Sequence, residues 1–259
     1  MSTEPFVIPL TNLALVLMPV AVVLVVLLRW SLDSANALYS VARMGLQLAL
    51  IGFLLDSIFA GSGHWLVLLV LTVMVTAASW IALGTVKPQR VRLLSRAFLS
   101  ILLCGGSVLW LVVILVLEEP SLWAPRVVIP LAGMIFAGAM NSISLAADRL
   151  QAELANGANP ITARDTAMQT AMIPVINSML AVGLVSLPGM MTGQILSGVS
   201  PLIAVRYQVV VMCMLFGTSG MATALFLKLA LPLMAAAGVG SGGTNSGLKD
   251  GETIKGNQQ

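Results

Sequence analysis

The chain has 259 residues, of which 58% are hydrophobic and only 9% are charged, and its formal net charge is +3. Its mean hydropathy is +1.00, whereas soluble domains carry about 25% charged residues. This composition excludes a soluble catalytic domain, gives no indication of nucleic-acid binding, and predicts an all-α, polytopic integral membrane protein.

Seven apolar segments follow one another along the chain, and each has close to the ~20 residues that a membrane-spanning helix needs. They cover residues 8–28, 37–59, 65–86, 97–117, 127–147, 169–187 and 207–230. We therefore predict about seven transmembrane helices within a permease domain at 1–237. Residues 238–259 lack apolar side chains to bury, which predicts a disordered cytoplasmic tail.

The orientation follows from a predicted linker between two apolar segments, KPQRVRLLSR at 87–96, which holds four basic residues. The positive-inside rule places this stretch in the cytoplasm and predicts an N-out, C-in arrangement. The loops then assigned to the outer side are 60–64, 118–126 and 188–206. Eleven Lys and Arg residues fall on or near the inner side and only Arg126 and Arg206 fall outside. We expect a multi-pass protein of the plasma (inner) membrane.

The stretch 184–198, LVSLPGMMTGQILSG, is apolar enough for a membrane but contains Pro188, Gly189 and two further glycines. Non-helical backbone is tolerated at membrane depth only where it is buried in protein or lines a water-filled cavity. We therefore predict a broken segment that acts as a gate. An extra short span and a re-entrant hairpin are alternatives for the same stretch.

The candidates for a translocation path are uncharged, because the apolar segments offer almost no ionisable residue deep in the membrane. The candidate path or gate residues are Gln47, Asn141, Asn177, Pro188, Gly189, Met190, Met191, Gln194 and Gln208. We expect Asn141 and Asn177 to face the bundle interior, where interhelical hydrogen bonding is the alternative role. Met190 and Met191 are candidate metal ligands, since thioethers favour soft ions such as Cu(I); flexible packing is the alternative.

A polar stretch at about 151–165 separates the fifth and sixth segments on the cytoplasmic side. Gly157 can adopt the left-handed conformation that ends a helix. Asn159 followed by Pro160 is a good N-cap and first-turn pair. The pattern predicts a helix, a tight turn and a second helix, an element suited to a groove on another protein.

The sequence QAELANGANP at 151–160 resembles the EAA loop of ABC-transporter permeases, whose coupling helix docks into an ATPase subunit. In that comparison Gln151 stands where Glu is usual, and Glu153 replaces the second Ala. The resemblance implies a set of ATPase-coupling residues, namely Gln151, Ala152, Glu153, Gly157, Ala158 and Pro160.

Longer stretches resemble the FetB (YbbM) family of bacterial permeases, to which plant aluminium-tolerance transporters are related. They are IPLAGMIFAGAMNS at 129–142, GLVSLPGMMTGQILSG at 183–198, and Pro201 through Tyr207-Gln208. This resemblance implies the permease subunit of an ABC exporter of iron or another metal ion. It also implies a separately encoded ATPase that binds ATP and Mg, no cofactor on this chain, and a homodimer in the lipid bilayer.

No GxxxxGK[ST] motif occurs in the sequence, so ATP hydrolysis cannot belong to this chain. There is also no GxSxG and only one His, which argues against an integral-membrane enzyme. Two alternatives stay open: an ATP-independent metal channel or secondary carrier, and an ABC exporter of an organic solute such as a nucleotide sugar.

Overall fold

The computed structural model describes residues 9–60, 64–119 and 123–242. These residues are almost entirely helical, and an isolated bridge between Val182 and Ser186 is the extended pairing assigned among them. The chain divides into two compact units, Met1–Ser62 and Gly63–Gln259, which are described separately.

Unit 1 contains three helices. They are α1 (Leu10–Leu15), α2 (Leu17–Arg29) and α3 (Ser34–Ala60). The chain turns from α2 into α3 through Ser31 at φ 55°, and the Asp33 carboxylate accepts the Asn36 backbone N–H at 3.1 Å, near the start of α3. None of the α2 residues is buried. A helix that is apolar all round is typical of a membrane span.

Unit 2 contains the remaining helices, several of which join into longer runs. They are α4 (His64–Ala82), η1 (Lys87–Gln89), α5 (Arg90–Ser100), η2 (Ile101–Gly105), α6 (Gly106–Trp110), η3 (Leu111–Val116), α7 (Pro125–Ala155), α8 (Pro160–Ala181), α9 (Gly189–Leu196) and α10 (Pro201–Gly242). Among the described residues, four helical runs are long and apolar enough to cross a membrane: His64–Ala82, Lys87–Val116, Pro125–Ala155 and Pro201–Ala236.

Each of the seven predicted apolar segments overlaps one or more helices, and several boundaries differ. The basic stretch 87–96 is helical rather than a linker, because Leu93 on one side of the helix is buried in the core while Arg92 is exposed. The sixth helix ends at Ala181, before the predicted 187. The seventh continues to Gly242, so the predicted tail starts inside it, and 243–259 lie outside the described residues.

The core of unit 2 forms around α7, which packs against α4, α8 and α10. Alanines at four-residue spacing on α8, namely Ala163, Ala167 and Ala171, are fully buried. Small side chains at this spacing allow membrane helices to approach closely. Gly138 of α7 lies so near α10 that an added Cβ would be 3.1 Å from the Leu215 side chain. Small residues therefore let α7, α8 and α10 approach closely, and large buried side chains such as Phe226 and Ile135 fill the core between the helices.

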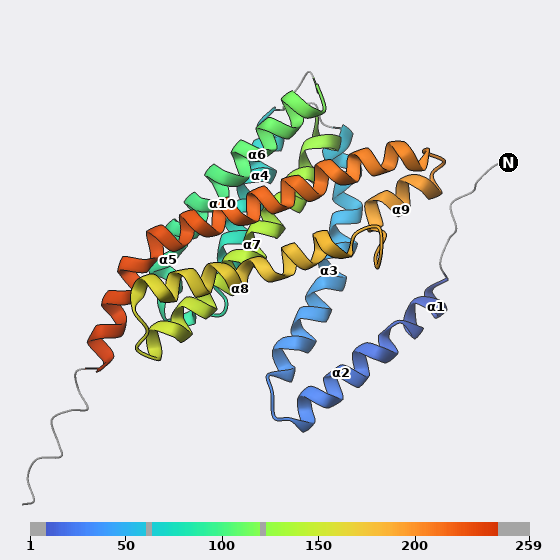
Figure 1. Ribbon diagram of the computed structural model, residues 1–259. Coiled ribbons are helices and arrows are strands. Elements are labelled where there is room, and N and C mark those ends of the chain that lie inside the picture. Colours follow the sequence, from blue (N-terminus) through green and yellow to red (C-terminus); the bar gives the residue numbers. More distant parts are fainter. Residues whose placement is uncertain (1–8, 61–63, 120–122, 243–259) are drawn as a thin grey trace, which may run out of the picture. The chain divides into compact units, whose positions relative to one another are not determined.

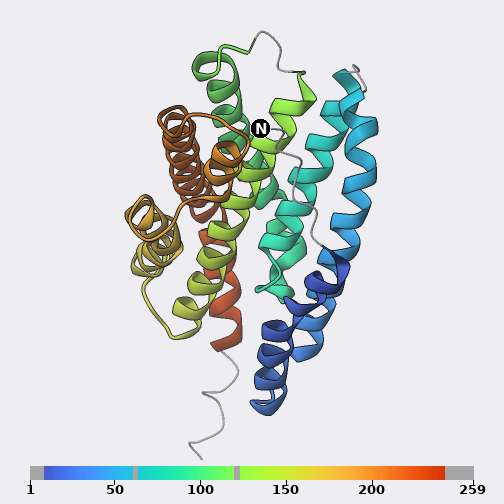
Figure 2. The ribbon, with the colours of Figure 1, turned by 90° about the vertical axis from the view of Figure 1, so that its right-hand side faces the viewer.

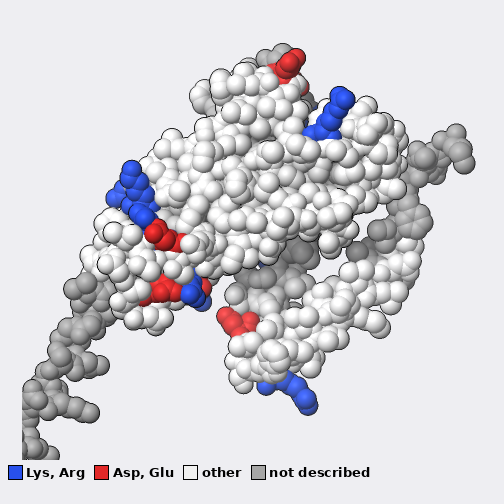
Figure 3. All heavy atoms as spheres, viewed as in Figure 1, with Lys and Arg blue, Asp and Glu red and all other residues white. Residues whose placement is uncertain are grey.

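Helices α8 and α10 run antiparallel and side by side in unit 2 (Figures 1 and 2). The α7–α8 turn and the last turns of α10 lie at one end of the unit, and α9 lies toward the opposite end (Figure 1). On the face shown in Figure 3, the surface over the middle of these helices is free of Lys, Arg, Asp and Glu. An uncharged middle between charged ends is the pattern expected of membrane-spanning helices.

Candidate translocation site

The turn between α7 and α8 has the predicted helix–turn–helix geometry. Gly157 has φ +79°, and two backbone hydrogen bonds close the end of α7, from Ala158 N to Glu153 O at 3.0 Å and from Gly157 N to Leu154 O at 3.1 Å. These are the two bonds of a Schellman motif. The Asn159 side chain accepts the Ile161 N–H at 2.9 Å and caps α8. The local prediction is confirmed: a Schellman motif ends α7 and the Asn159 side chain caps α8.

The six predicted coupling residues form the surface of this turn. Ala152, Gly157 and Pro160 are exposed, while Gln151, Glu153 and Ala158 are half-buried. Ion pairs flank the turn on both sides, joining Arg149 to Glu153 at 2.5 Å and Arg164 to Asp165 at 2.7 Å. The turn therefore presents a small apolar and polar surface between charged neighbours.

At its other end α8 breaks in the predicted region. Val182 is extended, and Gly183 has φ +82° and donates its N–H to Ser186 O at 3.0 Å. The following Leu184 is 90% exposed and Val185 is 84% exposed. Pro188 stands at the N-cap of α9 and Gly189 is its first residue. The broken segment is thus confirmed as a short turn followed by a two-turn helix.

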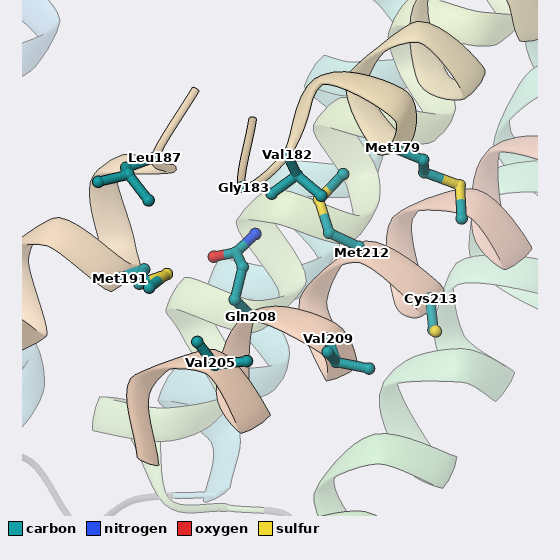
Figure 4. A pocket seen from close by; sticks show the side chains of 10 residues that line it. All are labelled: Met179, Val182, Gly183, Leu187, Met191, Val205, Gln208, Val209, Met212 and Cys213. Atoms are coloured by element: carbon teal, nitrogen blue, oxygen red, sulfur yellow. The ribbon is translucent and has the colours of Figure 1, made fainter. Parts of the chain in front are cut away.

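A cavity of about 340 Å³ lies between the end of α8, α9 and α10 (Figure 4). We call it the α9 cavity, and it is lined by Met179, Val182, Gly183, Leu187, Met191, Val205, Gln208, Val209, Met212 and Cys213. Gln208 is only 5% exposed, and its Oε1 has no hydrogen-bond partner among the described residues. Figure 4 shows this amide projecting between the Met191 and Met212 side chains. The α9 cavity is therefore apolar and sulfur-rich, with one unsatisfied amide.

A second cavity, of about 470 Å³, lies farther along α8 and α10, toward the middle of α7. We call it the serine cavity, and it is lined by Gly138, Asn141, Ser142, Ser144, Leu145, Ala171, Pro174, Val175, Ser178, Met212, Leu215 and Ser219. The Ser219 hydroxyl is buried without a hydrogen-bond partner in the described part of the chain. Met212 lines both cavities. The two cavities are therefore neighbours along the α8–α10 contact.

The structure brings three of the predicted path residues to these cavities: Asn141 to the serine cavity, and Met191 and Gln208 to the α9 cavity. Met190 does not join Met191. It lines a third cavity, with Tyr207 and Arg126. Adjacent residues on a helix point about 100° apart, so the two thioethers do not form the predicted ligand pair.

Three other predicted path residues lie outside these cavities. Asn177 is exposed rather than facing the interior, because α8 packs mainly against α7 and α10 in the described part of unit 2 and Asn177 lies on another face. Gln194 is half-buried, with an Oε1 that has no partner in the described residues, and it lines none of the three cavities. Gln47 is exposed on α3 in unit 1.

Sequence reasoning missed Met212 and Ser219 as lining residues. Gln208, Met212 and Ser219 follow each other at spacings of four and seven on α10, which places them on one helix face. The spacing can be read in the sequence, but it does not stand out, because α10 is apolar on every side and has few polar residues.

The family match covers residues 10–234 and carries the description "Uncharacterised protein family (UPF0014)". The chain belongs to the UPF0014 family. It is 35% identical to "UPF0014 membrane protein slr1647" of Synechocystis over 73% of this chain and 79% of that protein. It is 35% identical to "Probable iron export permease protein FetB" of Escherichia coli over 82% and 86% of the two chains. It is 36% identical to "Protein ALUMINUM SENSITIVE 3" of Arabidopsis thaliana over 77% of this chain and 78% of that protein.

These relationships confirm the resemblance drawn from the motifs at 129–142 and 183–198, both of which lie within the matched region. Together with the long apolar helices, they establish a multi-pass membrane protein of the UPF0014 family. No solved structure matches the chain. The arrangement of α7 to α10 around the two cavities therefore comes from this structure alone.

Proposed function

We propose that this UPF0014 member is the permease subunit of an ABC exporter that moves iron or another metal ion across the plasma membrane. It would act as a homodimer with a separately encoded ATPase, which binds the ATP and Mg. The family relationship supports the permease assignment, and the name of the E. coli relative supports metal export. This chain would bind no cofactor of its own.

One observation carries the proposal: α8 connects the capped turn to the cavities. The helix has 22 residues, which corresponds to about 33 Å at ~1.5 Å per residue. In length, though not in apolar composition, it matches a membrane span. Its first residue belongs to the turn, and Met179 near its last turn lines the α9 cavity. A displacement of the turn by the ATPase is therefore transmitted along one helix to the lining of the path.

Pro174 gives α8 a point at which it can bend. It lies inside the helix and lines the serine cavity. A proline within a helix removes one backbone hydrogen bond and favours a kink. Movement of the turn would thus change the angle of the last part of α8 relative to α10, and so open or close the two cavities in sequence.

The test uses two substitutions at Gly157 in the reconstituted complex of this chain with its ATPase. An added Cβ meets no atom within 4 Å, so the effect of a substitution comes from the backbone at φ +79°. Gly157→Val is strained there by ~1–2 kcal/mol, whereas Asn visits this conformation readily. We expect Gly157→Val to abolish cargo-stimulated ATP hydrolysis and Gly157→Asn to retain most of it.

Equal coupling in both variants would count against the turn as the coupling element. Metal flux into liposomes that contain the purified chain alone would instead identify the ATP-independent channel or secondary carrier. Cellular metal content with and without the gene tests the cargo: unchanged iron together with altered export of a nucleotide sugar would replace the metal assignment and leave the permease assignment intact.

A further inference from the structure

The third cavity, which Met190 lines, combines a large apolar lining with two opposite charges. Its volume is about 530 Å³, within the range of ~300–1,000 Å³ that is usual for ligand sites. The lining comes from the end of η3 and the residues after it, and from the early turns of α7, α9 and α10. Nine of the twelve lining residues are apolar, and the other three are Glu119, Arg126 and Tyr207.

The apolar and polar residues of the third cavity differ in exposure. Val112, Leu131 and Val211 are buried, at 3%, 7% and 5% exposed. Tyr207 is 42% exposed, and the Arg126 side chain is exposed as well. The cavity therefore has an apolar interior and a polar rim. A tyrosine at such a rim is typical of the membrane–water interface, where its ring and its hydroxyl meet different surroundings.

The two charges of the third cavity do not neutralise each other. Glu119 is half-buried, and its backbone position is fixed by the bond from its N–H to Val113 O at 3.0 Å. Within the described residues, neither Glu119 nor Arg126 takes part in an ion pair. Opposite charges that line one cavity without pairing can both be satisfied by a ligand that carries both signs of charge.

We propose that the third cavity binds a phospholipid with a primary ammonium headgroup, phosphatidylethanolamine. The Arg126 guanidinium would hold the phosphate, for which its planar set of donors is suited. The Glu119 carboxylate would accept hydrogen bonds from the ammonium group, and one acyl chain would follow the apolar lining. Such lipids surround the chain, because it is a multi-pass membrane protein. The inference is independent of the transported cargo.

The same charges disfavour the other common headgroups. Phosphatidylglycerol has no positive charge, so its phosphate would bring a net negative charge close to Glu119 and leave that carboxylate without a partner. Phosphatidylcholine has a quaternary ammonium without N–H donors, and proteins recognise this group with cages of several aromatic rings. Tyr207 is the one aromatic residue among those described that line the third cavity. The lining therefore fits the primary ammonium best.

The test measures lipid retention by native mass spectrometry of the purified full-length chain. The chain is equilibrated with equal amounts of the three phospholipids, all with the same acyl chains. We expect the wild type to retain phosphatidylethanolamine preferentially. Arg126→Gln should lower its retention by about tenfold, the effect of removing one hydrogen bond to a charged group, and should lower that of phosphatidylglycerol too. Glu119→Gln should abolish the preference for phosphatidylethanolamine over phosphatidylglycerol, because the phosphate partner is retained.

The chain offers a matched control for each charge. Glu118 is adjacent to Glu119 in sequence, and Arg206 is adjacent to Tyr207; both are exposed and line none of the three cavities. Glu118→Gln and Arg206→Gln should leave retention and headgroup preference unchanged. Equal retention of the three lipids by the wild type would overturn the proposal, as would equal losses in site and control variants. The assay contains neither ATPase nor metal, so its outcome is separate from the Gly157 coupling test.

Discussion

The two ends of α8 both contain a glycine in the left-handed region, Gly157 before the helix and Gly183 after it. At the first end a Schellman motif and the Asn159 cap close the turn and ion pairs flank it, although the Gln151 Oε1 is buried there without a hydrogen-bond partner among the described residues. At the second end the chain exposes Leu184 and Val185 and borders a cavity with an unsatisfied amide. The backbone at the first end is held by these hydrogen bonds, whereas the segment at the second end is exposed and lies beside a cavity into which it can move.

The difference indicates that the two ends of α8 have different roles: the first transmits a displacement and the second changes conformation. A turn closed by a Schellman motif and a side-chain cap resists deformation and can transmit a displacement as a rigid element. A segment with few buried contacts and open space beside it belongs to the less stable part of a fold, from which gates are drawn. Substitutions at the two ends should therefore affect different measurements.

The largest effect is expected from Met212→Trp, which fills the junction between the two cavities. We expect export by the reconstituted complex to fall by about tenfold or more, corresponding to ~1.4 kcal/mol in the transport barrier. The matched control is Met221→Trp, because Met221 lies on the same helix and is 46% exposed. Equal export by the two variants would show that cargo does not pass the Met212 junction.

The next effect compares Gly183→Val with Gly183→Asn. No atom lies within 4 Å of an added Cβ at this position, and φ is +82°, so Val should cost about 1–2 kcal/mol and Asn much less. Unfolding of the purified chain in an SDS titration measures this cost. Unlike Gly157→Val, Gly183→Val should keep ATPase coupling, because Gly183 lies at the other end of α8. Lost coupling in Gly183→Val would erase the proposed distinction between the ends.

A smaller effect is expected from Asn159→Ala, which removes the N-cap of α8. Loss of the bond from Ile161 N–H to the Asn159 side chain should lower the free energy of unfolding by about 1 kcal/mol. Asn177→Ala is the control within the same helix, where the side chain is exposed and Ala has the higher helix propensity. The SDS titration should therefore separate the two variants, with Asn177→Ala neutral or slightly stabilising.

The smallest effect is expected from Arg149→Gln beside the turn. The Arg149 side chain is 46% exposed and that of Glu153 is 19% exposed, and exposed pairs four residues apart on a helix contribute only about 0.3–0.5 kcal/mol. A double-mutant cycle with Glu153→Gln isolates this interaction. A coupling energy well above 1 kcal/mol would mean that the ion pair helps to hold the turn, in addition to its caps.

Local features of the fold could be predicted because their causes are local. The conformations of Gly157 and Asn159 follow from backbone sterics and one side-chain bond, and each apolar segment is long enough to predict a helix. The basic stretch 87–96 was misinterpreted as a linker because charge was weighed above periodicity. The buried Leu93 and Ala97, four residues apart, were the indication of a helix.

The site was predicted less completely, because it depends on which helix faces meet. Met190 and Met191 are equivalent in sequence, yet they line different cavities. Asn177 is exposed although its amide suggested an interior position. In a helix that is apolar on every side, hydrophobicity gives no direction to the core, so the position of a single polar residue cannot be inferred from pattern alone.

The sequence by itself determined the membrane class, the helix succession, the capped turn and the break after α8, since these depend on composition, length and residues within a few positions of one another. Only the tertiary structure decided that Met179, Met191, Gln208 and Met212 share one cavity, and that Met212 also borders the serine cavity. The physical reason is that small residues on α7 and α8 let the helix backbones approach, and this packing fixes which faces of α8, α9 and α10 meet.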